Sequence, residues 1–267
     1  MKVLLLTGSH PRHFYVVNEL KKYGLVSAHL VEERESFLPQ PPIDLNDIDQ
    51  ANFIRHFSER DEAENKHFID LNNQLEDIPV FRTSLQDLNS VKTLNWIKEQ
   101  KFDVAITYGV HKIENEVLSV LGEYAWNIHG GLSPWYKGNI TLFWPFIMLK
   151  PNWAGMTIHK LNNRLDAGDI VHHAVPTLEY GDGIHDVACK AVKAVTQDIV
   201  NILQKNTLDK IVYRKQEYNG KLWTSQDWTP QHLRFIYNLY DNDIVNQYLD
   251  GNLTITYPKL MKKNVEI

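Results

Sequence analysis

The first 31 residues have the pattern of a strand, a helix and a second strand, and this pattern constrains the fold more than any other feature. Residues 2–7 form an apolar run that stops at Gly8, which is typical of a buried parallel strand. Ser9 is a candidate N-cap for a helix that Gly24 would end. Residues 26–31 then form a second apolar run. Two parallel strands joined by a helix predict a Rossmann-like α/β sheet.

The chain continues with the same alternation of apolar runs and helical spacing. Residues 33–78 are polar and charged, and we expect an irregular connection followed by one or two solvent-facing helices that carry no chemistry. Residues 88–97 repeat apolar side chains at helical spacing, with Ser84 or Ser90 as the cap. The remaining predictions are strands over 102–107, 124–128, 155–159 and 170–175, a short helix over 142–149 and a long amphipathic helix over 188–203.

The pattern changes near residue 206. Beyond it we expect a hairpin around Asn219 and Gly220, a helix capped by Thr229 and Pro230, and a last strand over 253–257. The predicted domains are a Rossmann-like main domain over 1–206, with a mostly parallel sheet and helices on both faces, and a small C-terminal hairpin and helix appendage over 207–267.

Composition excludes several classes of protein. A formal net charge of −5 argues against broad binding of nucleic acid. A single cysteine, Cys189, excludes an internal disulfide and favours a reducing compartment. The first residues are too short for a signal peptide, and no apolar run approaches the ~18 residues of a membrane span. The expected setting is cytoplasmic, without a membrane partner.

The candidate site is the stretch from Trp126 to Gly138, where a short apolar strand breaks into a glycine-rich loop. Asn127 and His129 are two residues apart, so in a strand they point to the same face. Ligand sites of parallel sheets lie at the carboxyl ends of the strands. Asp166, in the loop over 165–170, is the third polar residue of interest.

Three other chemistries fit the sequence poorly. A metal site is not predicted, because asparagine is a weak zinc ligand and adjacent His172 and His173 would point to opposite faces of a strand. Ser133 lacks the context of a hydrolase nucleophile. The turn after the first strand lacks the G-x-G-x-x-G spacing of a dinucleotide site, which weakens a nicotinamide oxidoreductase.

Three separated motifs carry a family resemblance. Asn127-x-His129 is followed by Gly-Leu-Ser-Pro-x-Tyr-x-Gly, then by Gly-x-Thr-x-His159, then by Leu-Asp166-x-Gly-Asp-Ile. In this order they resemble the formyltransferase family that uses N10-formyltetrahydrofolate. The resemblance implies a Rossmann-like catalytic domain in which Asn127, His129 and Asp166 are catalytic, with N10-formyltetrahydrofolate as formyl donor and no metal.

The chemistry of these residue types agrees with that assignment. When an amine attacks a formyl carbon, negative charge develops on oxygen, and the amide of Asn127 could stabilise it, an effect worth ~10²–10³ in rate. His129 could accept the proton of the amine, which is worth ~10²–10⁴. We expect Asp166 to fix the imidazole tautomer and to stabilise its charged form. His159 would either orient Asp166 or fill a strand face.

The acceptor amine follows from the family's known members. An acidic chain with a short tail disfavours methionyl-tRNA, and some sixty residues after the long helix disfavour glycinamide ribonucleotide, which we keep as an alternative. The layout is most similar to sugar N-formyltransferases, which act on nucleotide-linked 4-amino-4,6-dideoxy sugars in surface-polysaccharide (O-antigen) synthesis. A homodimer is expected. A folate- or nucleotide-binding module without catalysis is a further alternative, which the complete set of Asn127, His129 and Asp166 disfavours.

The same resemblance suggests where the ligands bind. Folate is expected along the loop after the strand over 102–107 and along the loop of Asp166, and the nucleotide-linked amino sugar at the turn after the first strand. The predicted folate residues are Tyr108, Gly109, Val110, His111, Ile113 and Asp169, and the predicted substrate residues are Ser9, His10, Arg12, His13, Lys137 and His159.

Overall fold

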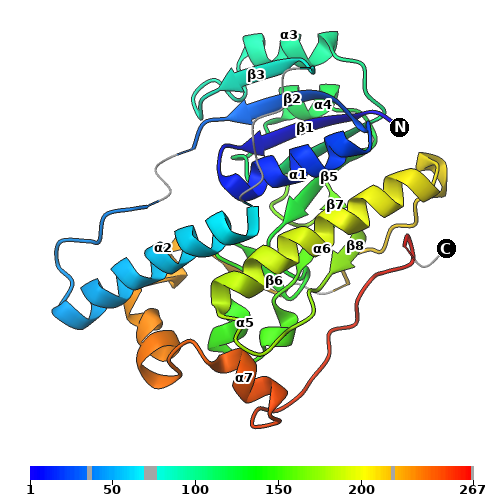
Figure 1. Cartoon of the computed structure of the whole chain (residues 1–267). Helices are drawn as coiled ribbons and strands as arrows, with labels where there is room; N and C mark the ends of the chain where they lie inside the picture. Colours follow the sequence, from blue (N-terminus) through cyan, green and yellow to red (C-terminus); the bar gives the residue numbers. More distant parts are fainter. Residues whose placement is uncertain (35–37, 69–76, 218–219, 266–267) are drawn as a thin grey trace.

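A seven-stranded sheet forms the centre of the molecule (Figure 1). The structure, a computed structural model, describes residues 1–34, 38–68, 77–217 and 220–265. The strand order is β3-β2-β1-β4-β5-β7-β8; the first five are parallel, and β7 and β8 are antiparallel to their neighbours. The strands are β1 (Val3–Gly8), β2 (Val26–Glu32), β3 (Val80–Thr83), β4 (Val104–Tyr108), β5 (Ala125–His129), β7 (Met156–Lys160) and β8 (Ile170–Ala174).

Helices cover both faces of this sheet, as the alternation of side chains along β1 requires. Val3 and Leu5 point into the core under α1 (Pro11–Lys22) and α6 (Ile184–Lys205), whereas Leu4 and Leu6 point into a second core. That second core is closed by α3 (Val91–Glu99) and α4 (Asn115–Val120). The predicted Rossmann-like, mostly parallel sheet is therefore confirmed. Among the described residues, no helix is both long and apolar enough to cross a bilayer.

The remaining elements are short and lie in two parts of the chain, between β5 and β7 and after α6. Most of them pack into a third core with Trp144, Ile236 and Val245, whereas Leu208 packs against the core under α6. These elements are β6 (Tyr136–Gly138), α5 (Trp144–Ile147), α7 (Ile244–Leu249), β9 (Lys221–Trp223), the 3₁₀ turns Pro151–Trp153, Leu208–Lys210, Ser225–Asp227 and Pro230–His232, and the π turn Phe235–Leu239.

Two predicted helix starts have different outcomes. Ser90 caps α3, because its hydroxyl accepts a hydrogen bond from the Thr93 backbone N–H at 3.3 Å. Ser9 does not cap α1. His10 is the N-cap, and the hydroxyl of Ser9 instead accepts a hydrogen bond from the backbone N–H of Arg34 at 2.9 Å.

The prediction of solvent-facing helices after residue 33 is wrong for α2 (Asp47–Phe68), which buries one side against α1 and α6. The buried side includes two carboxylates. Glu64 pairs with Arg12, and Asp49 accepts from the guanidinium of Arg234 at 2.7 and 2.8 Å. Both partners lie far away in sequence, so the charges of α2 stabilise tertiary contacts. Residues 35–37 and 69–76 of this stretch lie outside the described residues.

The predicted C-terminal hairpin is also wrong. β9 pairs in parallel with β6, and Arg214 makes an antiparallel bridge with Ile170. Asn219 of the predicted turn lies outside the described residues. The predicted helix after Thr229 is confirmed but irregular, because the 3₁₀ turn Pro230–His232 continues through residues 233–234 into the π turn Phe235–Leu239. Residues 253–257 are not a strand.

Residues on both sides of position 206 share two cores. Ile211 joins the core under α6, and Ile236 packs with Trp144. The division into domains at residue 206 stays a prediction.

Candidate active site

Sheet register brings three polar side chains into one row. Thr107 of β4 lies opposite Asn127 of β5, and Asn127 lies opposite His159 of β7. Directly opposed residues on neighbouring strands point to the same face of a sheet. Asn127 is therefore flanked by a hydroxyl on one side and an imidazole on the other, near the carboxyl ends of β4 and β5.

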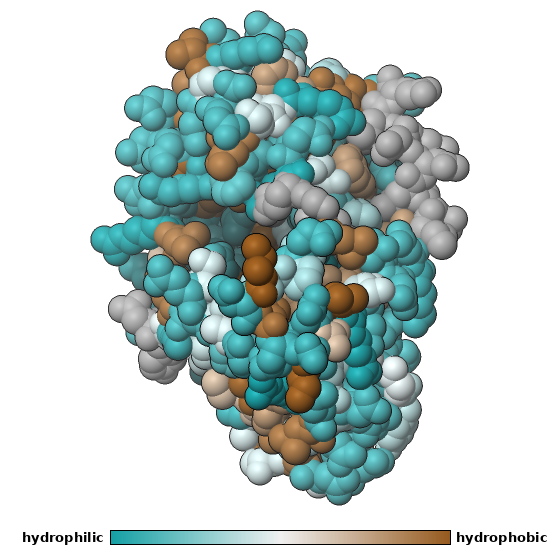
Figure 2. All heavy atoms as spheres, turned by 90° about the vertical axis from the view of Figure 1, so that its left-hand side faces the viewer, coloured by the Kyte–Doolittle hydropathy of each residue, from teal (hydrophilic) through white to brown (hydrophobic). Residues whose placement is uncertain are grey.

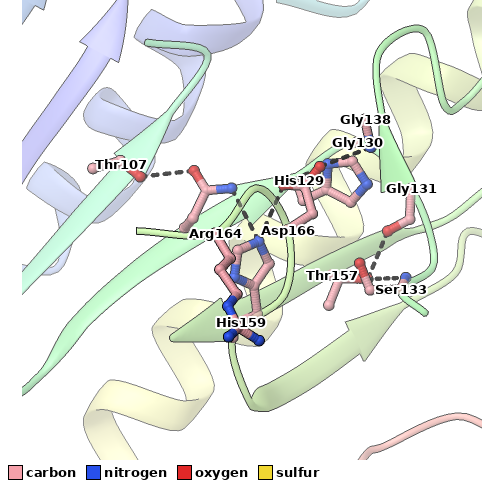
Figure 3. A network of polar contacts seen from close by, with 12 residues as sticks. Thr107, His129, Gly130, Gly131, Ser133, Gly138, Thr157, His159, Arg164 and Asp166 are labelled. Atoms are coloured by element: carbon pink, nitrogen blue, oxygen red, sulfur yellow. Dashed lines mark hydrogen bonds and ion pairs between the residues drawn. The ribbon is translucent and has the colours of Figure 1, made fainter. Parts of the chain in front are cut away.

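Hydrogen bonds fix the orientation of the Asn127 amide (Figure 3). Thr107 donates its hydroxyl to Oδ1 of Asn127 at 2.7 Å. On the other side, Nδ2 of Asn127 donates to Nε2 of His159 at 3.2 Å. His159 can accept there because its Nδ1 donates to the carbonyl of Lys160 at 2.8 Å. The NH₂ group of Asn127 therefore faces His159, and one of its two hydrogens stays available to an acceptor in the pocket.

The loop before β8 adds the carboxylate of Asp166 to this row (Figure 3). One carboxylate oxygen, Oδ1, lies 3.4 Å from Nε2 of His159 and 3.4 Å from Nδ1 of His129. The other, Oδ2, accepts from the backbone N–H of Gly138 at 2.8 Å. The predicted trio of Asn127, His129 and Asp166 therefore meets in one place, with His159 between Asn127 and Asp166.

The tautomer of His129 differs from the expectation. Nε2 of His129 lies 2.8 Å from the backbone carbonyl of Tyr136, which can only accept, so Nε2 carries the proton. The lone pair is then on Nδ1, beside Asp166. A separation of 3.4 Å exceeds the ~2.7–2.9 Å of a charged N–H···O bond, as expected when Nδ1 has no proton. The Tyr136 carbonyl thus fixes the tautomer of His129, and the Asp166 carboxylate lies beside the basic nitrogen, Nδ1.

Burial and charge set the protonation states. Only 6% of His129 is exposed, and this burial lowers the pKa of His129 although the charge of Asp166 partly raises it. Burial disfavours the charge of Asp166 as well, but the two imidazoles and the Gly138 N–H outweigh it and lower the pKa of Asp166. A neutral imidazole beside an ionised carboxylate is a base whose charged form is stabilised as soon as it accepts a proton.

The loop after β5 is held by Thr157 of β7 (Figure 3). Its hydroxyl donates to the carbonyl of Gly131 at 2.6 Å and accepts from the N–H of Ser133 at 2.8 Å. A Cβ at Gly131 would lie 2.8 Å from Nε2 of His129, so glycine is needed for the close packing. Sequence reasoning gave no role to Thr107, Thr157 or the Tyr136 carbonyl. Thr157 stands in the motif that ends at His159, whereas only the pairing of β4 with β5 would have indicated Thr107.

The turn after β1 is only partly available to a ligand. Ser9 and His10 are half-buried, and Arg12 is engaged by Glu64. The His13 ring is 3% exposed and fills the space beside Gly109, and its contact with substrate stays a prediction. A Cβ at Gly109 would lie 2.2 Å from the His13 ring, so His13 closes the gap between β1 and β4.

Two other predicted substrate residues lie close to the central cluster. Lys137 is 8% exposed and stands in β6 next to Gly138, which binds Asp166. His159 is 2% exposed, and its imidazole nitrogens bond to Asn127 and to a backbone carbonyl. His159 therefore orients polar groups of the site, and its direct contact with substrate stays a prediction.

The predicted folate residues divide into accessible and inaccessible ones. Tyr108 and Ile113 are 6% and 5% exposed and belong to the apolar cores, and their contact with folate stays a prediction. Gly109 is exposed, and Val110 and His111 are half-buried. Asp169 is half-buried, and its carbonyl accepts from the Lys160 N–H at 2.8 Å.

Exposed apolar side chains lie next to Asp166 in the chain or near its partner Gly138. Leu165 and Ile140 are 60% and 43% exposed, and Leu222 is 47% exposed beside Gly138. Figure 2 looks onto the side where the parallel strands of Figure 1 end, and this face is hollowed near its middle with hydrophobic side chains along the border. In the described part of the chain, no three His, Cys, Asp or Glu side chains form a group that could hold a metal ion.

Chemically, the cluster suits the attack of an amine on a carbonyl carbon. An amide N–H can stabilise the developing oxyanion, and a neutral imidazole can accept the proton that the amine loses. Asp166 then stabilises the imidazolium. These roles of Asn127, His129 and Asp166 are hypotheses that the distances support.

Comparison with known sequences identifies one family. The family model described as formyl transferase matches residues 59–203, more than half of the chain. Methionyl-tRNA formyltransferase of Buchnera aphidicola subsp. Acyrthosiphon pisum is 25% identical over 141 residues. That match covers 52% of this chain and 44% of the relative, so the chain spans less than half the length of that protein.

Solved structures show the same fold at low identity. The N-formyltransferase from Helicobacter canadensis, with folinic acid and dTDP-3-aminofucose, has a TM-score of 0.55, 14% identity and coverage of 90% and 82% of the two chains. PseJ from Anoxybacillus kamchatkensis, with UDP-4,6-dideoxy-4-formamido-L-AltNAc and tetrahydrofolate, has a TM-score of 0.51 and 17% identity, and the match covers 91% of this chain and 95% of PseJ. Phosphoribosylglycinamide formyltransferase from Anaplasma phagocytophilum has a TM-score of 0.52 and 15% identity, and the match covers 84% of this chain and 97% of that protein.

Proposed function

The chain belongs to the formyl transferase family, and from this membership we propose that it transfers a formyl group from N10-formyltetrahydrofolate to the amine of a nucleotide-linked 4-amino-4,6-dideoxy sugar. Two solved structures of similar fold contain a nucleotide-linked amino sugar together with a folate, which supports this class of substrate; the nitrogen is at C4 of the sugar in one and at C3 in the other. The formal net charge of −5 disfavours tRNA as the acceptor. O-antigen synthesis, a cytoplasmic setting and a homodimer stay predictions.

One observation carries the proposal: the hydrogen-bonded row from Thr107 through Asn127 and His159 to Asp166, which ends at His129. A binding protein for folate or a nucleotide needs neither an oriented amide donor nor a buried base beside a carboxylate. Formyl transfer needs both, because negative and positive charge develop at the same time.

In the first step, the amine nitrogen of the sugar bonds to the formyl carbon, and the carbonyl π electrons move to oxygen. The second hydrogen of Nδ2 in Asn127 donates to this oxyanion, since Thr107 holds Oδ1 on the other side. The attacking nitrogen becomes positively charged and loses its proton to Nδ1 of His129, the nitrogen without a hydrogen.

In the second step, the carbonyl re-forms and the bond between the formyl carbon and N10 of the folate breaks. The proton held by His129 moves to N10, so tetrahydrofolate leaves neutral at that atom. Between the steps the imidazolium is stabilised by Asp166, whose carboxylate is kept ionised by the Gly138 N–H and the neighbouring imidazoles.

The surroundings of the cluster suit the proposed acceptor. Exposed Leu165, Ile140 and Leu222 offer apolar contacts to the deoxygenated edge of a 4,6-dideoxy sugar. The nucleotide diphosphate would bind at the N-terminus of α1 near Ser9 and His10, with Arg12 and Lys137 as further predicted charge partners. The accessible residues Gly109, Val110 and His111, together with the Asp169 loop, are the proposed folate contacts.

We expect a nucleotide-linked 4-amino-4,6-dideoxy sugar to stabilise the protein. A ligand at about 100 times its Kd adds about 2.7 kcal/mol to the free energy of unfolding, which corresponds to a rise in Tm on the order of 5 °C. Thermal unfolding with dTDP-, UDP- and GDP-linked sugars, with glycinamide ribonucleotide as the control, measures this. Stabilisation by glycinamide ribonucleotide alone would overturn the proposed acceptor and support the alternative.

We expect Thr107→Val to lower kcat about tenfold, because the valine cannot donate to Oδ1 and the Asn127 amide is then free to turn over. Valine has nearly the same shape, and Thr107 is only 1% exposed, so packing is preserved. The matched control is Thr107→Ser, which keeps the hydroxyl and should retain most of kcat. Release of tetrahydrofolate measures both; equal kcat in the valine variant would exclude the positioning role.

A further inference from the structure

Gln216 touches the catalytic loop from the C-terminal part of the chain. Its side-chain amide donates one hydrogen bond to the backbone carbonyl of Asp166 at 2.8 Å and a second to the carbonyl of Gly168 at 2.7 Å. An amide nitrogen has two hydrogens, so both are used on this one loop. No motif in the sequence indicated this contact, since Gln216 lies 50 residues after Asp166.

The backbone on which Gln216 stands is itself anchored to the sheet. Arg214 exchanges two backbone hydrogen bonds with Ile170, the first residue of β8, at 2.7 and 2.9 Å. A second anchor, Asn264, accepts from the N–H of Val212 and donates to the carbonyls of Val171 and Val212. Gln216 is therefore held at a fixed distance from the loop it contacts.

The loop needs such a support because its backbone is constrained. Asp166 has φ +46°, in the left-handed region that costs a non-glycine residue about 1 kcal/mol or more. Gly168 packs so closely on Lys160 that an added Cβ would lie 1.8 Å from the Lys160 carbonyl. The two carbonyls held by Gln216 flank this tight turn, so its amide stabilises the conformation that directs the Asp166 carboxylate inward.

We propose that Gln216 is a positioning residue that holds the Asp166 carboxylate beside Nδ1 of His129, and that the segment after residue 206 thereby forms part of the catalytic apparatus. The proposal rests on the formyl transfer proposed above. The carboxylate is 3.4 Å from both His129 and His159, and a small shift of the loop would separate it from the base. His129 would then lose the charge that stabilises its protonated form.

The experiment compares three substitutions at Gln216. Gln216→Met keeps length and volume but removes both donors, and we expect kcat to fall about tenfold while KM for either substrate changes less than about threefold. Gln216→Glu presents acceptors to two carbonyls and should be at least as impaired. Gln216→Lys supplies donors on a chain of similar length and should recover most of kcat. The exposed neighbour gives the matched control, Glu217→Gln, which should behave as the unmodified protein.

A second readout separates positioning from general destabilisation. The groups that face the imidazole of His129 are Asp166, His159 and the Tyr136 carbonyl. The charge of Asp166 and the hydrogen bond to Tyr136 raise the pKa of His129, and His159 lowers it. Loss of this charge should lower the pKa of His129, so the acid limb of the kcat profile should move to lower pH in Gln216→Met. NMR titration of the His129 ring measures the same shift without any substrate. If the variants unfold at the same temperature and the pKa of His129 is unchanged, the proposal is wrong.

The two proposals fail differently. If the unmodified protein transfers no formyl group to any sugar nucleotide, the proposed function fails, and the NMR titration still tests whether Gln216 places Asp166 beside His129. If transfer occurs and Gln216→Met retains full kcat with an unshifted profile, only the role of Gln216 is lost.

Discussion

His129→Asn is expected to lower kcat about 10³-fold while leaving the binding of folate nearly unchanged. The amide of the new side chain takes the place of Nδ1 of His129 and can donate to Asp166, whereas the hydrogen bond from Nε2 to the Tyr136 carbonyl is lost. The variant has no nitrogen lone pair that can accept a proton near neutral pH. The attacking amine then keeps its proton, and the tetrahedral intermediate returns to the starting compounds.

Single-turnover formyl transfer and folate binding by calorimetry measure the two effects separately. The matched control is His232→Asn at a half-buried position, where the imidazole forms hydrogen bonds with Thr229 and packs edge-on against Trp144. That variant should transfer formyl at the unmodified rate. Full transfer by His129→Asn would remove the base from the mechanism, and loss of folate binding together with transfer would assign His129 to binding.

The parallel sheet could be predicted from the sequence because its strands are buried on both faces. β1 and β4 consist almost entirely of apolar residues, and such runs are short, continuous and bounded by glycine or polar loops. The pairing of β6 with β9 could not be predicted. Each has three residues and its partner is more than 80 positions away, whereas the Asn219–Gly220 dipeptide is a strong local signal for a hairpin.

Charge on α2 was misleading for a related reason. The spacing of charged residues along a helix predicts that they face solvent, unless an oppositely charged partner is known. In α2 the partners are Arg12 for Glu64 and Arg234 for Asp49. Both carboxylates are buried, at 3% and 0% exposure, and both pairs join segments distant in sequence. A single sequence contains no information on such pairs, so a helix that links the sheet to the C-terminal segment has the pattern of a solvated one.

In the candidate site, too, some residues could be predicted from local sequence and others depend on contacts that only the fold creates. Asn127 and His129 could be predicted because two-residue spacing in a strand is local, and Asp166 followed from the resemblance. His13 could not be recognised as packing, because the space that it fills exists only where Gly8 and Gly109 of separate strands lack side chains. The roles of Thr107 and Gln216 depend on register and on a contact across 50 residues, which only the folded chain reveals.

Asp166→Asn is expected to lower kcat by about 10²–10³-fold, and for two reasons. The imidazolium of His129 loses the carboxylate that lies 3.4 Å from Nδ1, so proton transfer from the amine becomes less favourable. In addition, the amide can donate to Nδ1 and occupy the lone pair that the mechanism needs. Because Asp166 raises the pKa of His129, its removal should move the acid limb of the kcat profile to lower pH.

The same substitution changes the pH dependence of stability. The pKa of Asp166 is lower in the folded protein than in the unfolded chain, so its ionisation stabilises the fold above the unfolded pKa of about 3.9 and this contribution is lost as the pH falls through the folded pKa. In Asp166→Asn that part of the acid sensitivity should be absent. Chemical denaturation of both proteins between about pH 6 and pH 3 measures the difference, with Asp169→Asn in the same loop as the control. Parallel curves for the unmodified protein and Asp166→Asn would mean that the carboxylate is not held by Gly138 and the two imidazoles, and the mechanism would lose the group that stabilises its base.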